Sequence, residues 1–200
     1  MADGLNMPKM STPSMSTWTR AWTTIALMTL IAVIYVRWQG RIWWCACGRL
    51  NPVSTQVNSQ HNSQHLIDPY SLSHVLHGVL FFGVLWLFRK KIQPAWRFVI
   101  ATTIEIAWEM VENSPVIINR YRAATVSLGY TGDSIINSLG DIASFMLGFY
   151  LAKKLGLWRS IAVSFAVELA MLWLMRDNLT LNVLMLLWPI DAVRKWQSAG

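Results

Sequence analysis

Residues 62–78, NSQHLIDPYSLSHVLHG, combine histidines with acidic and hydroxyl side chains at the start of an apolar run. His74 and His77 are three residues apart, so they share one face if a helix begins near Ser71. Imidazole nitrogens at this spacing can bind a metal ion, and near neutral pH they can also accept or donate protons. The pair therefore predicts a metal site or a proton-handling site.

Carboxylates recur at helical spacing on two later segments. One segment carries Glu105, Glu109 and Glu112, and the next carries Asp133, Asn137 and Asp141. Each set is expected to form a single stripe, because residues three or four positions apart lie on the same helix face. The two stripes and the histidine pair therefore predict a shared polar site between three helices.

This site has the groups that metal-dependent hydrolysis needs. We predict that one divalent metal ion is bound by His74, His77, Glu109 and Asp133. A general base for water would be Glu112 or Asp141, and substrate would be bound by Asn137, Arg120 and Arg122. The structural alternative is a set of hydrogen bonds that only joins neighbouring helices.

The composition is that of a membrane protein. The chain has 54% hydrophobic and 14% charged residues, twelve Trp and a mean hydropathy of +0.37. Its net charge of +7 comes from basic residues at the ends of apolar segments, as membrane orientation requires. No basic face or phosphate loop accompanies this charge, so we predict no nucleic-acid partner.

The apolar segments predict an all-α, polytopic helical membrane protein with five to six transmembrane helices. Residues 1–19 are predicted to be a flexible tail, and residues 20–200 a single helical membrane domain. The predicted spans are residues 21–36, 71–88, 95–113, 133–152 and 159–175, with residues 179–190 as a short sixth candidate. Residues 118–132 are expected to form a connecting loop.

The distribution of Lys and Arg predicts the orientation. Of the 17 such residues, eleven lie on the side of the N-terminus in this topology, Arg194 and Lys195 included. Because cytoplasmic segments are enriched in basic residues, the N-terminus is predicted to be cytoplasmic and residues 40–70 periplasmic. The chain would then be a multi-pass protein of the cell inner membrane with an outward-facing polar pocket.

Burial in lipid would be costly for the acidic stripe. A carboxylate at the centre of a membrane helix costs about 2.5 to 3.5 kcal/mol, whereas a strong apolar residue returns only about 0.3 to 0.6 kcal/mol. The apolar residues of the third predicted span would therefore offset about one central glutamate, and the span carries three. These acids must face a polar interior, lie at an interface, or be neutralised.

Cys45 and Cys47 are the only cysteines, and both lie in the loop over residues 40–70. A structural role is predicted, as a disulfide or as inert thiols, although a one-residue spacer strains disulfide geometry. A metal-binding pair is the other alternative. The C-x-C spacing differs from the usual C-x-x-C of redox enzymes, which disfavours redox catalysis.

Three long strings carry a family resemblance: NSQHLIDPYSLSHVLHG, WEMVENSPVIINRYR and GYTGDSIINSLGDI. They resemble an uncharacterised family of multi-pass inner-membrane proteins from alphaproteobacteria, known as a domain of unknown function. The order Asp, His-x-x-x-Gly, Glu-x-x-Glu and Asp-x-x-x-Asn is also similar to VanZ-like membrane proteins, a group associated with teicoplanin resistance. This second resemblance implies a shared helical core and no antibiotic phenotype.

Two classes of function fit these features. The first is an intramembrane metal-dependent hydrolase or transferase that acts on a lipid or lipid-linked substrate in the bilayer. The alternative is a non-catalytic transporter, proton-linked conduit or assembly protein, in which the polar cluster is structural or binds a partner. A conduit needs polar residues through to the inner face, and the segments VLFFGVLWLF and SFMLGFYLA contain almost none. The pattern therefore favours a one-sided pocket.

Overall fold

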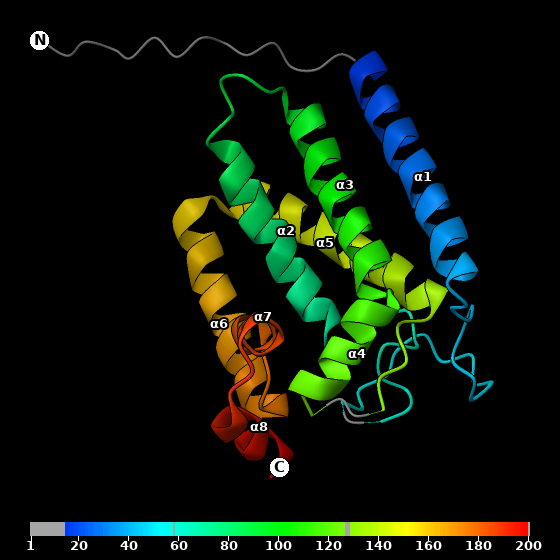
Figure 1. Ribbon diagram of the computed structural model, residues 1–200. Helices are drawn as coiled ribbons and strands as arrows, with labels where there is room; N and C mark the ends of the chain where they lie inside the picture. The colour runs from blue at the N-terminus through cyan, green and yellow to red at the C-terminus, as the bar shows by residue number, and fades with distance from the viewer. Residues whose placement is uncertain (1–14, 58, 127–128, 200) are drawn as a thin grey trace, which may run out of the picture.

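The computed structural model describes residues 15–57, 59–126 and 129–199, and this part of the chain is all-helical, as predicted (Figure 1). The described residues contain one isolated β-bridge, between Val53 and Ile67, and no strand. The helices are α1 (Met15–Trp38), α2 (Ser71–Trp86), α3 (Pro94–Glu112), α4 (Pro115–Ala124), α5 (Ile135–Leu155), α6 (Leu157–Met175), α7 (Leu179–Leu187) and α8 (Asp191–Ser198).

Local sequence signals explain several helix starts. Helix α4 follows Ser114, whose hydroxyl accepts the Ile117 N–H, and Pro115 occupies its first position. The Ser134 hydroxyl caps α5 in the same way, and the Asn178 side chain caps α7. These caps satisfy backbone N–H groups that have no partner within the helix.

Three of the described helices are long and apolar enough to cross a membrane: Ser16–Trp38, Ile135–Leu155 and Leu157–Met175. Helix α2 is apolar but shorter, and α3 is not in this group despite its 19 residues. Helix α7 has nine residues and a length of about 14 Å, too short for a hydrocarbon layer of about 30 Å. The described helices are therefore compatible with a membrane protein, and both the crossing of the membrane and the number of spans remain predictions.

The fourth predicted span, residues 133–152, is shifted in the structure to α5, so Asp133 precedes the helix, and two other predicted boundaries also differ. Residues 118–132, expected to be a loop, contain most of α4, because the Ser114–Pro115 start signal initiates a helix directly after α3. Helix α1 begins at Met15, so residues 15–19 of the predicted tail are helical, and Trp18 packs near Phe98 with ring centroids 6.4 Å apart. Residues 1–14 of the tail lie outside the described residues.

Helix α2 packs very closely on α5, because glycines remove side chains from the contact. A Cβ atom added to Gly78 would lie 2.0 Å from the Phe145 carbonyl oxygen, and one added to Gly148 would lie 1.9 Å from that of Val75. This contact fixes the position of His74 along the axis of α5. Around it, Leu85, Phe98, Phe145 and their neighbours form an apolar cluster between α1, α2, α3 and α5.

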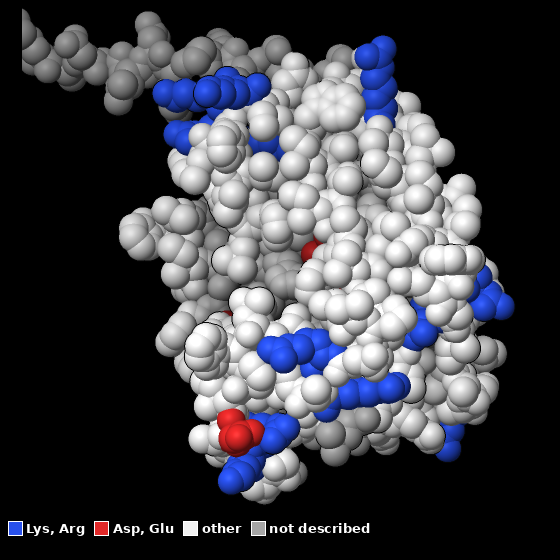
Figure 2. Space-filling model, viewed as in Figure 1, with Lys and Arg blue, Asp and Glu red and all other residues white. Residues whose placement is uncertain are grey.

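The basic residues lie towards two ends of the bundle. In Figure 2, blue side chains occupy the top and the bottom of the visible face, and a mainly uncharged band separates them. Arg194 and Lys195 were predicted to lie at the same end of the bundle as the N-terminus, and this prediction is wrong. The Arg194 guanidinium donates to the Ala123 carbonyl at 3.2 Å, which puts α8 beside α4 at the opposite end (Figure 1). The charge asymmetry behind the predicted orientation therefore shrinks.

Candidate functional site

His74 lies at the centre of a buried cluster formed by α2, α3 and α5. Its Nδ1 atom is 2.5 Å from Glu105 Oε1 and 3.6 Å from Glu109 Oε1, and its Nε2 atom is 3.8 Å from Asp141 Oδ2. His77, one turn further along α2, places Nδ1 3.5 Å from Glu105 Oε2. The predicted convergence of the three polar helix faces is therefore present in the structure.

The start of α2 is held by Asp68, which precedes it. The Asp68 carboxylate accepts the backbone N–H groups of Ser63, Tyr70 and Ser71 at 2.7 to 3.1 Å. Burial raises the pKa of Asp68, although these donors oppose that shift. The Ser71 hydroxyl in turn donates to Asp141 Oδ1 at 2.9 Å, so the first turn of α2 is tied to α5 at the level of the histidines.

A cavity of about 340 Å³ opens beside the cluster. Its polar wall includes His74, His77, Glu105, Glu112 and Asp141, and its apolar wall includes Phe81, Ile104, Trp108, Val183 and Leu187. Several of these apolar side chains are exposed. In Figure 2, an acidic side chain is visible in a hollow within the mainly uncharged band. The cavity therefore opens on an apolar face of the bundle.

Helix α7 forms one side of this cavity and is held at both ends. The Glu168 carboxylate of α6 accepts the Leu179 N–H at 3.0 Å and the Thr180 N–H at 3.2 Å, which caps the start of α7. The Arg120 side chain donates to the carbonyl oxygens of Leu186 and Leu187 at the other end. These contacts fix α7 over the polar cluster.

The predicted substrate-binding residues have structural contacts. Besides the bonds of Arg120 to α7, the Arg122 guanidinium donates to the Tyr130 carbonyl oxygen. The Asn137 amide donates to the His65 carbonyl at 2.8 Å, and its side chain is not part of the cavity lining. Their assignment to substrate stays a prediction.

Asp133 was predicted to be a metal ligand, and it lines the same cavity as the two histidines. Its carboxylate accepts the Tyr130 hydroxyl at 2.9 Å and the Asn113 amide at 3.0 Å. Burial raises the pKa of Asp133 to about 6, and the Tyr130 hydrogen bond opposes that shift. Asp133 belongs to neither group of potential metal ligands around His74.

Two groups of side chains around His74 could hold a metal ion. The first is His74, His77 and Glu105, and the second is His74, Glu109 and Asp141, with ligand atoms within 4.8 Å of one another in each. Glu105 was assigned no role from the sequence. Its position in the same acidic stripe as Glu109 was the signal that could have identified it as a ligand. Both Glu109 oxygens are buried without a hydrogen-bond partner among the described residues. The donor set, rich in carboxylates and imidazoles, fits a divalent cation.

The fold and site together define an all-helical protein with three helices long and apolar enough to cross a membrane and a buried histidine–carboxylate cluster in the described part of the chain. The chain belongs to the family described as a protein of unknown function, DUF2585, whose model matches residues 36–199. This finding confirms the resemblance to an uncharacterised alphaproteobacterial family, and the multi-pass inner-membrane character of that family remains a prediction. The resemblance to VanZ-like proteins remains a prediction.

Relatives of this chain occur across alphaproteobacteria. A UPF0314 protein of Paracoccus denitrificans is 48% identical over 178 residues, covering 89% of this chain and 92% of the relative. UPF0314 proteins of Agrobacterium fabrum and Sphingopyxis alaskensis are each 44% identical, and the matches cover 89% and 88% of this chain and 90% and 93% of the relatives. No solved structure matches the chain.

Proposed function

We propose that this protein is a metal-dependent hydrolase or transferase of the cell inner membrane that acts on a lipid or lipid-linked substrate. The observation that carries the proposal is the surplus of buried carboxylates around two imidazoles. Glu105, Glu109 and Asp141 are all nearly inaccessible, and two protonated histidines would still leave one acid unbalanced. A divalent cation bound by neutral imidazoles would balance two of the three carboxylates and a proton would neutralise the third, because an unpaired buried charge is too costly to retain.

His74, His77 and Glu105 are the proposed ligands. They come from adjacent helices, and they leave one side of the cluster open to the cavity, as a catalytic metal site requires. A divalent metal bound there would polarise a substrate oxygen and lower the pKa of a bound water. Glu109 lies near the same Nδ1 atom of His74 as Glu105, and Asp141 lies near its Nε2 atom, so both would orient the ring.

Glu112 is the proposed general base. It lines the cavity and is partly accessible, so it can take a proton from a water molecule in the open part of the pocket. Asp141 is the second candidate, but its two oxygens already face the Ser71 hydroxyl and the His74 ring. We therefore assign proton transfer to Glu112 and ring positioning to Asp141.

The surroundings of the cavity support a lipid substrate. Ile104, Val183 and Leu187 are exposed apolar residues in the cavity wall, and in a bilayer they would contact acyl chains. A volume of about 340 Å³ suits a polar head group beside the acidic cluster. A substrate could thus keep its chains in the bilayer while its head group enters the pocket.

The apolar cluster argues against a continuous conduit. Leu85, Phe98 and Phe149 pack together where α2, α3 and α5 continue beyond the polar site. A proton or ion path would need polar groups along this part of the bundle. The arrangement favours a pocket that is closed on one side.

Complementation of a deletion strain tests the proposed function. We expect the strain to accumulate one lipid or lipid-linked species, and the wild-type gene to restore the lipid profile. Glu112→Gln should insert normally yet restore turnover about a hundredfold or more less well, the usual effect of losing a general base. Asp191→Asn is the control, because Asp191 is exposed on α8 and pairs only with Arg194 among the described residues. Full restoration by both Glu112→Gln and His77→Ala would overturn the proposal.

A further inference from the structure

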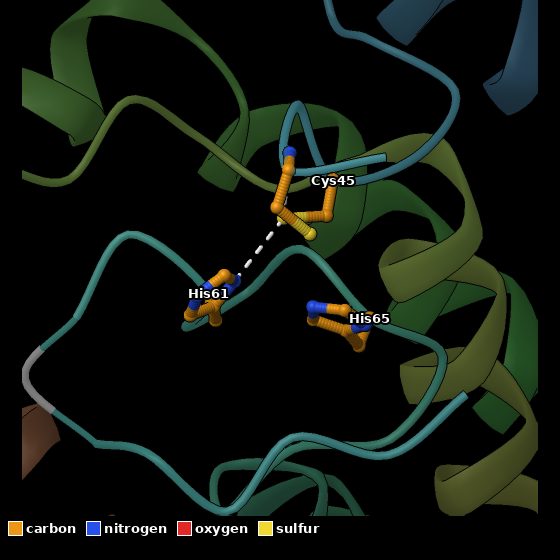
Figure 3. Close-up of side chains that lie close together, drawn as sticks. Cys45, His61 and His65 are labelled. Atoms are coloured by element: carbon orange, nitrogen blue, oxygen red, sulfur yellow. Dashed lines mark hydrogen bonds between the residues drawn. The ribbon is translucent and has the colours of Figure 1, made fainter. Parts of the chain in front are cut away.

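A second cluster of metal-binding side chain types lies in the long loop between α1 and α2, apart from the pocket. Cys45 and Cys47 come from a C-x-C sequence, and His61 and His65 from an H-x-x-x-H sequence. One ligand atom from each of the four residues lies within 4.8 Å of the other three. Figure 3 shows the Cys45, His61 and His65 side chains facing a common space from separate parts of the loop.

The two histidines are oriented as metal ligands. His65 Nδ1 is 2.6 Å from the Asn51 carbonyl oxygen, so Nδ1 carries the proton and Nε2 keeps its lone pair for a ligand. His61 Nδ1 lies 3.4 Å from Cys45 Sγ. Tetrahedral zinc, with bonds of about 2.3 Å to sulfur and about 2.0 Å to nitrogen, separates such atoms by about 3.5 Å. The Cys45–His61 pair already has this spacing.

The cysteine geometry agrees with a metal-bound pair. Both thiols are free in the structure, and the Cys47 backbone N–H donates to Cys45 Sγ at 3.5 Å. Cys45 and His65 are buried, whereas Cys47 and His61 are partly accessible, which gives an ion a route from solvent. The disulfide predicted as one alternative would need a strained ring with a single intervening residue.

The loop that carries these residues covers the start of α5. The Ser134 N–H donates to the Ser63 carbonyl at 2.9 Å, and the Ile135 N–H donates to that of Ile42 at 2.8 Å. The Asn137 amide reaches the His65 carbonyl. A cross-link between the cysteine and histidine halves of the loop would therefore fix both of the segments that cap α5.

We propose that Cys45, Cys47, His61 and His65 bind one structural Zn²⁺ ion that holds the loop across the start of α5. Two thiolates and two imidazoles are a zinc donor set, and all four positions are filled by protein, as in a structural site. The site is independent of the pocket, which contains no thiol among its described lining residues.

Reconstitution of the full-length protein with Co²⁺ in detergent tests this site. Thiolate ligands give Co²⁺ an intense sulfur-to-metal charge-transfer absorption that histidines and carboxylates do not give. We expect this absorption in the wild type and in His77→Ala, because His77 belongs to the pocket. It should be lost in the Cys45→Ser, Cys47→Ser double variant, and one added equivalent of Zn²⁺ should displace it from the wild type. Absence of the absorption in folded wild-type protein would overturn the proposal.

Thiol labelling of the wild type gives a test that needs no variant. If zinc holds both thiols, a maleimide should react with them slowly, and a chelator should raise the labelling rate at least tenfold. Thiols that label equally fast without chelator would contradict the site. Thiols that label only after reduction would show a disulfide and also contradict it.

Discussion

Replacement of Gly148 by alanine should separate α2 from α5 and disturb the histidine cluster. The added Cβ would lie 1.9 Å from the Val75 carbonyl oxygen and 2.7 Å from its carbon. Ordinary contact begins at 3.4 Å, so the backbones must move apart by about 1.5 Å. Overpacking of this kind costs about 1 to 3 kcal/mol, more than the gain of about 1 kcal/mol from alanine in a helix.

The displacement should reach the site, because Val75 follows His74 directly. The 2.5 Å contact between His74 and Glu105 and the 3.8 Å approach of His74 to Asp141 both depend on the position of α2. We expect Gly148→Ala to lower the thermal midpoint in detergent by about 2 to 8 °C for a chain of this size. It should also reduce the metal bound by the pocket.

Gly83→Ala is the matched control on α2, because nothing lies within 4 Å of a Cβ added at this position. This variant should keep the wild-type midpoint or raise it slightly. The packing argument would be refuted if Gly148→Ala retained the wild-type midpoint and metal content, or if Gly83→Ala were equally damaging.

Three further predictions concern the ends of the bundle. Because burial raises the pKa of Asp133 to about 6, the contribution of Asp133 to stability should be fully present below about pH 4 and should be lost as pH rises through 6. Thermal scans of wild type and Asp133→Asn should therefore differ in slope over this pH range, and equal slopes would contradict this cause. Glu168→Gln should weaken the cap of α7 and cost about 1 kcal/mol in denaturant unfolding, and a neutral result would remove that role. In protein without native cysteines, an impermeant reagent should label Gln56→Cys in intact cells but Lys91→Cys only after permeabilisation; labelling from the same side would exclude a crossing by α2.

The sequence predicted the long apolar helices and the shared polar faces but neither α4 nor α8, because the predictions depend on short-range periodicity over long apolar segments. Predicted spans 95–113 and 159–175 differ from α3 and α6 by no more than two residues at either end. The histidine and carboxylate stripes meet as expected. Which glutamate contacts His74 was not predictable, because Glu105 and Glu109 share one face and only the relative height of α2 and α3 selects between them.

Other features depend on tertiary contacts that periodicity does not encode. Arg194 was predicted at the wrong end of the bundle because residues 179–190 were treated as a membrane span. In the structure, contacts at both ends of α7 hold this helix against the pocket, and Arg194 contacts α4. The His61 and His65 pair received no role, although an H-x-x-x-H sequence that follows two closely spaced cysteines is similar to known zinc-binding patterns. The loop brings the two sequences together across many residues, so their proximity required the structure.

The metal content of the pocket is the most direct test of the central claim. The Cys45→Ser, Cys47→Ser double variant removes the thiol ligands of the loop, so elemental analysis of the purified protein would report the pocket. We predict a single equivalent of divalent metal near pH 7.5, a decline as pH falls through about 6.5, and loss of this metal when His77→Ala is added. A double variant that contains no metal yet restores the lipid profile of the deletion strain would contradict the account.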